Sequence, residues 1–255
     1  MGNGRKPTVK ICGIRDEETL RGLLTLPVDQ IGFVFAKSRR QVTPEEAGSL
    51  IRIAREERGD ALHRTVGVFV EPSREELTAV LAKAPVDIVQ LHSEESPDDC
   101  RWIREQFGVQ VYRVISLASQ AKRSGKMDLR RPIQPLRAAK ELLLPYQGSV
   151  DAVLLDTYDP VTIGGSGRTF PWESIPPYRE AAHRLGMSLI AAGGLTIDNV
   201  RSLLDLYHPD GVDISGGVET DGVKDIQKIR TFVERVKGHE QADRIAANRK
   251  PDELS

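Results

Sequence analysis

Short apolar runs alternate with longer amphipathic segments along this chain, and the alternation predicts repeated strand–helix units. We expect eight strands, near Thr8–Cys12, Gln30–Phe35, Thr65–Val70, Asp87–Leu91, Gln110–Ile115, Ala152–Leu155, Ser188–Ala192 and Gly211–Ser215. We expect helices near Glu17–Leu26, Pro44–Arg58, Arg74–Ala82, Pro97–Phe107, Trp172–Leu185, Ile197–Leu206 and Lys224–Lys237. Helix-start signals support this interpretation at Thr43, which precedes a proline and two acids, and at Ser73.

The expected strands are apolar nearly throughout, which is typical of strands whose two faces are both covered by helices. A closed barrel and an open doubly wound sheet both satisfy this pattern. The eight units, and the absence of an early dinucleotide-binding fingerprint, favour the barrel. We therefore predict an α/β fold, a single-domain (β/α)8 TIM barrel over residues 8–238, with a polar, flexible tail at 239–255.

The segment Leu117–Ser149 interrupts the alternation between the fifth and sixth strands. It contains three prolines and is strongly basic. We expect one helix in it, near Pro135–Leu144, and an extended surface excursion for the remainder. A basic contact site for a partner is the alternative, but a solvated insertion is favoured.

Composition narrows the class of protein. The chain has 255 residues, with 36 basic against 37 acidic side chains and a net charge of −1, so no broad basic surface for nucleic acid is expected. Its two cysteines do not resemble a disulfide framework or a metal site. Neither a membrane-spanning run nor a signal peptide is recognisable, which favours a cytoplasmic protein.

Cys12 ends the first expected strand, just before a glycine, and barrel active sites are built at such strand ends. A lone cysteine in an apolar strand is more often a small buried residue than a catalytic one. Lys10 lies two residues earlier, on the same side of the strand, where its ammonium would favour a thiolate. An ion pair between Lys10 and Asp213, on the neighbouring last strand, is an equally good interpretation, and both remain open.

Asp156 ends the sixth expected strand after four apolar residues. Partial burial there would raise its pKa and keep it protonated as a general acid, although a strand-ending aspartate also caps turns. The glycine-rich run Gly164–Gly167 follows it. This run predicts a mobile loop that acts as a lid, and it is not a phosphate-binding Walker motif.

Candidate anion-binding residues follow other strands. Small residues end the seventh and eighth strands, around Gly194 and at Ser215-Gly216, where barrel enzymes often hold phosphate. Arg40 follows the second strand and suits a substrate carboxylate, or is merely solvated. His92 follows the fourth strand and either orients substrate or is a satisfied rim histidine.

Taken together, these segments closely resemble the phosphoribosylanthranilate isomerases of tryptophan biosynthesis. The resemblance runs in order over most of residues 8–237. It is carried by Val9-Lys10-Ile11-Cys12-Gly13-Ile14, Gly32-Phe33-Val34-Phe35, Ser38-Arg39-Arg40, Pro44-Glu45-Glu46-Ala47, Val66-Gly67-Val68-Phe69-Val70, Val89-Gln90-Leu91-His92, Leu154-Leu155-Asp156-Thr157, Gly164-Gly165-Ser166-Gly167, Gly193-Gly194-Leu195 and Gly217-Val218-Glu219.

The resemblance implies a TIM barrel that catalyses an Amadori rearrangement of a small phosphorylated substrate, without metal or organic cofactor. By matching position, Asp156 would protonate the furanose ring oxygen, and Cys12, as thiolate, would remove the proton from sugar C2. Arg40 would pair with the anthranilate carboxylate. The residues in the phosphate-binding segments would be Gly194, Ser215 and Gly216. We expect a monomer or homodimer.

Two positions depart from the family pattern. Ser93 stands where glycine is usual, and Ser215-Gly216-Gly217 replaces the commoner Ser-Ser-Gly, so we expect an effect on phosphate affinity. Two other functions compete with the isomerase. One is another sugar-phosphate isomerase, such as that of the histidine pathway, which uses paired aspartates where this chain has Cys12. The other is a non-catalytic sugar-phosphate sensor that docks through the basic insertion.

Overall fold

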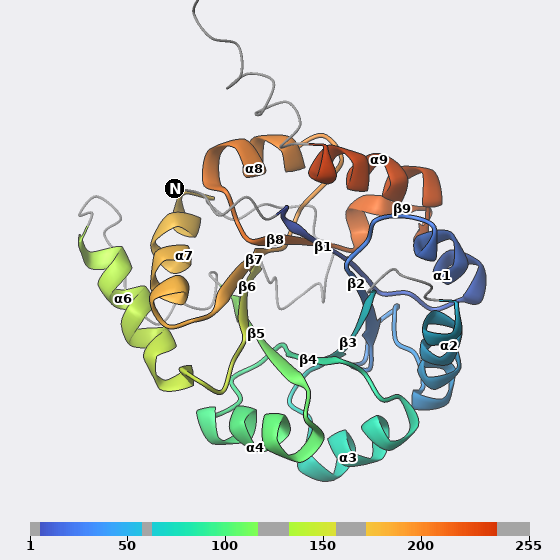
Figure 1. The fold of residues 1–255 in the computed structure, drawn as a ribbon, viewed down its shortest axis with the longest axis horizontal. Coiled ribbons are helices and arrows are strands. Elements are labelled where there is room, and N and C mark those ends of the chain that lie inside the picture. Colours follow the sequence, from blue (N-terminus) through green and yellow to red (C-terminus); the bar gives the residue numbers. More distant parts are fainter. Residues whose placement is uncertain (1–5, 58–62, 117–132, 157–171, 239–255) are drawn as a thin grey trace, which may run out of the picture.

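Eight parallel strands close into a barrel in the computed structural model, which describes residues 6–57, 63–116, 133–156 and 172–238 (Figure 1). Neighbouring strands follow chain order, and the last strand pairs with the first. The strands are β1 (Thr8–Cys12), β2 (Gln30–Val34), β3 (Arg64–Phe69), β4 (Ile88–Leu91), β5 (Gln110–Ser116), β6 (Ala152–Asp156), β7 (Ser188–Ala191) and β8 (Gly211–Ile214). The predicted TIM barrel is confirmed, with each strand end within one residue of its expected position.

Helices surround the barrel as an outer ring (Figure 1). They are α1 (Glu17–Leu24), α2 (Pro44–Glu56), α3 (Arg74–Lys83), α4 (Pro97–Phe107), α6 (Ile133–Leu143), α7 (Ile175–Arg184), α8 (Val200–Tyr207) and α9 (Ile226–Lys237). The expected caps form: Thr43 makes a capping box with Glu46, and the Ser73 hydroxyl accepts from the N–H of Glu76. In the part of the chain that the structure describes, no helix is long and apolar enough to cross a membrane.

Two apolar layers hold the barrel. The larger one lies between the strands and the ring helices and is fully buried at positions such as Ile11, Phe33 and Phe232. The smaller one fills the barrel interior with Val66, Ile88, Tyr112, Val114, Ala152, Leu154, Ile190 and Ala192. Because side chains alternate along each strand, the inward positions at the carboxyl ends remain for other groups. Those positions carry the candidate chemistry.

The helix expected between β5 and β6 is confirmed, and it is part of the barrel ring. Residues 117–132 lie outside the described residues, but 133–149 form α6 and a short 3₁₀ turn, η1 (Leu144–Tyr146). Ala139 and Leu143 are fully buried, and α6 packs beside α7 on the ring (Figure 1). This part of the segment is therefore a barrel helix, and α6 begins two residues before the predicted Pro135.

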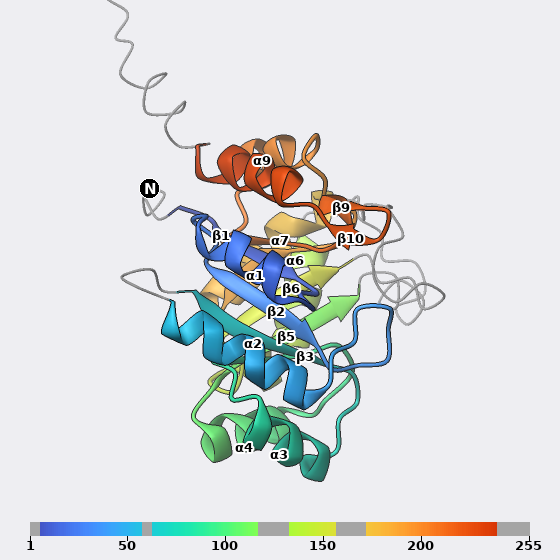
Figure 2. The ribbon, with the colours of Figure 1, turned by 90° about the vertical axis from the view of Figure 1, so that its right-hand side faces the viewer.

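Three predicted helices start later than expected. Lys224 is in a strand, not a helix, because Asp225 accepts hydrogen bonds from the N–H groups of Gln227 and Lys228 and so caps α9 at Ile226. Before it, β9 (Glu219–Thr220) and β10 (Val223–Lys224) form a small antiparallel hairpin. Figure 2 shows this hairpin at the end of the barrel toward which the strand arrows point. The other two helices lose their first turn to η2 (Trp172–Ser174), which precedes α7, and to a turn ending at Asn199 before α8.

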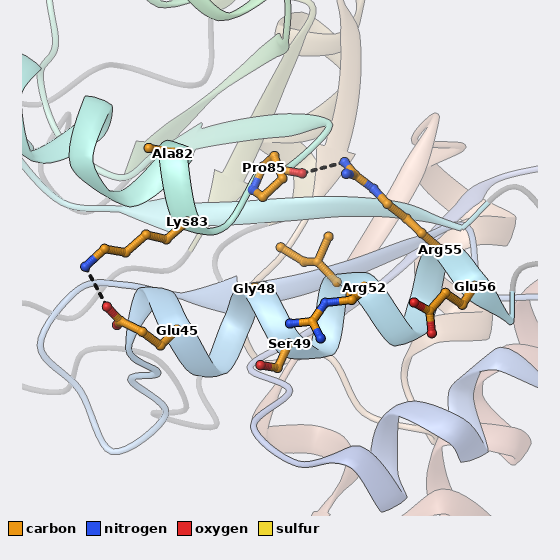
Figure 3. A pocket seen from close by; sticks show the side chains of 10 residues that line it. Glu45, Gly48, Ser49, Arg52, Arg55, Glu56, Ala82, Lys83 and Pro85 are labelled. Atoms are coloured by element: carbon orange, nitrogen blue, oxygen red, sulfur yellow. Dashed lines mark hydrogen bonds and ion pairs between the residues drawn. The ribbon is translucent and has the colours of Figure 1, made fainter.

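An open groove of about 690 Å³ lies between α2 and the end of α3, on the outer ring (Figure 3). Exposed charges border it, including the ion pair between Lys83 and Glu45 at 2.6 Å. Beneath it the two helices approach so closely that a Cβ added at Gly48 would lie 2.2 Å from the carbonyl oxygen of Lys83. Only glycine permits this helix contact.

We predict that Gly48→Ala destabilises the protein by about 1–3 kcal/mol, because the backbone of α3 must move to admit the methyl group. This cost exceeds the roughly 0.5–1 kcal/mol that alanine gains over glycine inside a helix. The matched control is Gly22→Ala in α1, where the methyl would meet the Ile226 side chain, whose Cδ1 would lie 2.6 Å away, rather than backbone. Urea unfolding measures both variants, and equal midpoints for the two would contradict the packing argument.

Candidate active site

The candidate proton carriers lie at the carboxyl end of the barrel, as predicted. Cys12 is the last residue of β1 and Asp156 the last residue of β6. His92 directly follows β4, and Ser215 directly follows β8. Residues far apart in the chain therefore face one interior space, because all eight strands end on the same side.

Lys10 satisfies both interpretations that the sequence left open. Its Nζ lies 2.8 Å from Oδ2 of Asp213, its register partner on β8, and its side chain is fully buried. Burial lowers the pKa of Lys10, but the charges of Asp213 and Cys12 outweigh it and raise the pKa. Lys10 therefore stays an ammonium and also contacts the thiol.

The Cys12 thiol experiences opposing influences. Burial raises its pKa above the ordinary 9.0, and the neighbouring Asp213 carboxylate adds to this. Lys10 and Lys224 lower the pKa, because their positive charges stabilise a thiolate. The balance is a raised pKa in the ligand-free protein. The thiol thus lies among charges that partly offset the effect of burial, which a purely packing cysteine would not need.

Gly32 is not among the candidate site residues predicted from the sequence, but its lack of a side chain leaves space beside Cys12. It is the register partner of Cys12 on β2, and a Cβ there would lie 2.9 Å from the Cys12 sulfur. Gly13 follows the thiol with a φ of +85°, which glycine adopts readily. The two glycines keep room around the sulfur and turn the chain away from it.

His92 connects the two halves of the site. Its Nε2 lies 3.7 Å from Oδ2 of Asp156, beyond hydrogen-bond distance, and it also senses the charges of Lys10 and Asp213. Burial lowers its pKa more than the Asp156 carboxylate raises it, so the imidazole is neutral at pH 7. The raised pKa expected for Asp156 itself stays a prediction.

Arg40 is buried rather than solvated, and it already holds a carboxylate of the protein. Its Nε donates to Oε1 of Glu219 at 2.7 Å and its Nη2 to Oε2 at 3.1 Å. Arg39 donates to the same carboxylate at 2.6 Å. The geometry is the two-point fork by which arginine recognises carboxylates.

Glu219 and Lys224 are the functional candidates that sequence reasoning missed. Glu219 is 5 % exposed, and Lys224 Nζ donates to its Oε1 at 2.9 Å. Burial raises the Glu219 pKa, but hydrogen bonds from Arg40 and Lys224 outweigh it and lower the pKa to about 2. The available signal was the Asp221-Gly222 pair, which is a hairpin-turn signature between two short polar strands.

The two glycine-rich segments expected to hold phosphate lie against each other. Gly193 and Gly194 have φ values of +76° and +63°. A Cβ at Gly217 would lie 2.0 Å from the carbonyl oxygen of Leu195, so only glycine allows the loop after β8 to touch the loop after β7. Gly216 begins the short 3₁₀ turn η3 (Gly216–Val218) on this loop.

Three further expectations from the sequence concern Ser93, the predicted lid and metal binding. Ser93 accepts a hydrogen bond from the N–H of Glu71 at 2.8 Å and donates to the Glu95 carboxylate, so its hydroxyl links the loops after β3 and β4. The predicted lid, Gly164–Gly167, lies outside the described residues. Within the described ranges, no group of three or more His, Cys, Asp or Glu side chains is arranged to hold a metal ion. The site offers acid–base groups and fixed cations.

Known proteins resemble this chain over nearly its whole length. The model of the N-(5'-phosphoribosyl)anthranilate isomerase family matches residues 9–235. A relative of that name from Brevibacillus brevis is 43% identical and covers 94% of this chain and 98% of its own. Monomers generated from the dimeric isomerase of Thermotoga maritima have a TM-score of 0.68 at 33% identity, covering 91% of this chain and 99% of theirs. An isomerase bound to reduced 1-(o-carboxyphenylamino)-1-deoxyribulose 5-phosphate has a TM-score of 0.66 at 32% identity, with the same coverage.

We predict that Glu219 makes stability depend on acid. Its folded pKa, about 2, lies below the ordinary 4.5, so its contribution is full above pH 4.5 and is lost as pH falls toward 2. That difference corresponds to on the order of 3 kcal/mol. Urea unfolding between pH 7 and pH 3 should show Glu219→Gln less stable than wild type at pH 7, with the gap narrowing in acid. Glu45→Gln, at the exposed pair with Lys83, is the control; a gap that stays constant with pH for Glu219→Gln would contradict the prediction.

Proposed function

The chain belongs to the N-(5'-phosphoribosyl)anthranilate isomerase family and is an isomerase of tryptophan biosynthesis, and we propose that Cys12 and Asp156 carry its two proton transfers. The observation that supports this assignment most strongly is the position of His92. Its imidazole lies 3.7 Å from Asp156, and the charges of Lys10 and Asp213, which lie beside the thiol, also shift its pKa. Acid and base therefore lie at the same end of the barrel, with one imidazole within electrostatic reach of both.

Asp156 is the general acid in this proposal. It donates its proton to the furanose ring oxygen while the C1–O bond breaks, and the nitrogen lone pair forms the C=N bond of an iminium. A side chain only 19 % exposed beside a neutral imidazole favours the protonated carboxyl. His92 then orients the acid and the sugar without adding a second charge.

Cys12 is the general base. Its thiolate takes the proton from C2, the C–H electrons form the C1=C2 bond, and the C=N pair returns to nitrogen. The resulting enolamine tautomerises to the 1-amino-1-deoxyketose. The adjacent iminium makes C2–H acidic, so a thiolate is basic enough. Lys10 and Lys224 lower the pKa of the thiol, but burial and Asp213 keep that pKa above its ordinary value, so the reacting thiolate is a small fraction of the protein at neutral pH.

The two anionic ends of the substrate fix its position. Arg40 pairs with the anthranilate carboxylate, alongside the carboxylate of Glu219 that it already holds. The phosphate lies against the segments of Gly194, Ser215 and Gly216, whose loops pack closely together. Backbone N–H groups of such loops are the natural donors to a phosphate. Such anchoring places C2 against the thiol, and a placed proton carrier typically contributes about 10²–10⁴-fold.

Several wider expectations follow from this function. The catalytic unit spans residues 8–238, with 239–255 as a tail outside it. The reaction is an isomerisation of one substrate in which proton transfers accompany ring opening and the shift of the double bond, so the proposed chemistry needs no external oxidant or reductant. We expect a cytoplasmic monomer or homodimer that binds neither nucleic acid nor membrane. The family assignment replaces the two alternative functions, a sugar-phosphate isomerase of the histidine pathway and a non-catalytic sugar-phosphate sensor.

We predict that Cys12→Ala and Asp156→Asn each lower kcat by about 10²–10⁴-fold while KM changes little, because each removes a proton carrier and leaves the anion contacts. The measurement is loss of substrate fluorescence with freshly generated N-(5'-phosphoribosyl)anthranilate.

Cys100→Ala is the matched cysteine control. Cys100 is buried in α4 away from the site, and burial raises the pKa of its thiol to about 12, so its removal should leave turnover unchanged. Circular dichroism checks the fold of all three variants. Wild-type turnover in a folded Cys12→Ala or Asp156→Asn variant would overturn that residue's role.

A further inference from the structure

The β9–β10 hairpin lies at the carboxyl end of the barrel (Figure 2). It brings two oppositely charged side chains together. Glu219 and Lys224 are register partners across the hairpin, and their side chains are 5 % and 4 % exposed. The turn between them contains Asp221 and Gly222, both with positive φ. Buried ion pairs are costly unless each partner is fully hydrogen-bonded, and this pair is.

Glu219 fixes the position of Arg40 from one side. Its two carboxylate oxygens accept from Nε and Nη2 of Arg40, which holds the guanidinium plane. On the other side, a Cβ at Gly13 would lie 2.6 Å from Cδ of Arg40, so the arginine stem packs directly on the residue after Cys12. The guanidinium thus has little freedom beside the thiol.

Lys224 fixes the position of Ser215 in a similar way. Its Nζ donates to the Ser215 carbonyl oxygen at 2.9 Å, to the Ser215 Oγ at 3.1 Å and to Glu219 Oε1 at 2.9 Å. These three acceptors use all three N–H groups of an ammonium. The Ser215 hydroxyl in turn donates to the carbonyl oxygen of Cys12 at 2.9 Å. Lys224 therefore holds the end of β8 against the end of β1.

We propose that Glu219 and Lys224 are a positioning pair that links the two anion-binding ends of the substrate site: Glu219 orients Arg40 for the carboxylate, and Lys224 orients the Ser215 segment for the phosphate. The inference rests on the proposed function, which gives Arg40 and Ser215 those roles. Neither member of the pair needs to touch the substrate.

The charges around Glu219 support its role as a carboxylate shared by several cations. Three cations, Arg39, Arg40 and Lys224, pair with the single carboxylate of Glu219, so positive charge is in excess around it. The substrate brings a carboxylate and a phosphate. Without Glu219 the cations would repel one another before substrate arrives, and their side chains would separate. Glu219 keeps them assembled yet leaves an excess positive charge for the ligand.

The test separates the two ends with two probes, anthranilate for the carboxylate end and inorganic phosphate for the other, each measured as a competitive inhibitor. Glu219→Gln should weaken anthranilate more than phosphate, and Lys224→Met should weaken phosphate more than anthranilate. The KM of the full substrate should rise about 10- to 100-fold in each, since a lost charged hydrogen bond costs about 1.5–3 kcal/mol. The kcat should fall much less.

Lys224→Met should also raise the Cys12 thiol pKa, measured from the pH dependence of iodoacetamide alkylation, because it removes a positive charge near the sulfur. Cys100, with a pKa of about 12, does not interfere. Lys224→Arg should restore the Cys12 thiol titration, since it keeps the charge, and Glu45→Gln on the outer ring should change neither probe. If Glu219→Gln prevents folding, Glu219→Asp, which shortens the acid and breaks the two-point contact, replaces it. If Lys224→Met prevents folding, Lys224→Gln, which removes the charge but keeps a hydrogen-bond donor, replaces it.

Two measurements distinguish failure of this inference from failure of the proposed function. Arg40→Met should weaken anthranilate, and phosphate should inhibit the wild-type protein competitively, if those roles are correct. Unchanged anthranilate inhibition in Arg40→Met, or no phosphate inhibition of the wild type, would refute the substrate contacts themselves. Both effects as expected, with no loss of probe binding in folded Glu219 and Lys224 variants, would overturn the positioning pair alone.

Discussion

The ion pair between Lys10 and Asp213 joins the first and last strands of the barrel directly beneath the candidate base. The two residues are register partners across the β1–β8 seam, and their charged atoms lie 2.8 Å apart in the interior. Breaking such a pair leaves an uncompensated buried charge, so barrel closure and the charge state around Cys12 depend on the same contact. Lys10 thereby serves the fold and the thiol at once.

Outside this seam, ion pairs between protein side chains fix the positions of the charged groups in the site. Arg40, a candidate ligand for the substrate, is already held by Glu219, and Glu219 is shared with Lys224. This arrangement presents cations that are oriented before the ligand binds, which reduces the entropy lost on binding. Two further features serve the reacting groups. Gly32 leaves space around the Cys12 sulfur, and the neutral imidazole of His92 lies near Asp156.

Much of the fold and part of the site could be predicted from the sequence. Apolar runs buried on both faces give a strong signal, so Cys12 and Asp156 could be placed at strand ends. The hairpin of Glu219 and Lys224 is much harder to predict, because strands of two residues have no periodicity, and the Asp221-Gly222 turn signal says nothing of which side chains the hairpin buries. The burial of Arg40 also escaped prediction, since its partner Glu219 is 179 residues away and meets it only when the barrel closes.

The most direct test of the acid–base assignment is a crystal structure of this protein with reduced 1-(o-carboxyphenylamino)-1-deoxyribulose 5-phosphate. The account predicts the Cys12 sulfur beside the carbon that corresponds to C2 and the Asp156 carboxyl beside the oxygen released from the ring. It also predicts Arg40 on the ligand carboxylate. A bound ligand whose C2 faces another side chain, with Cys12 out of reach, would contradict it.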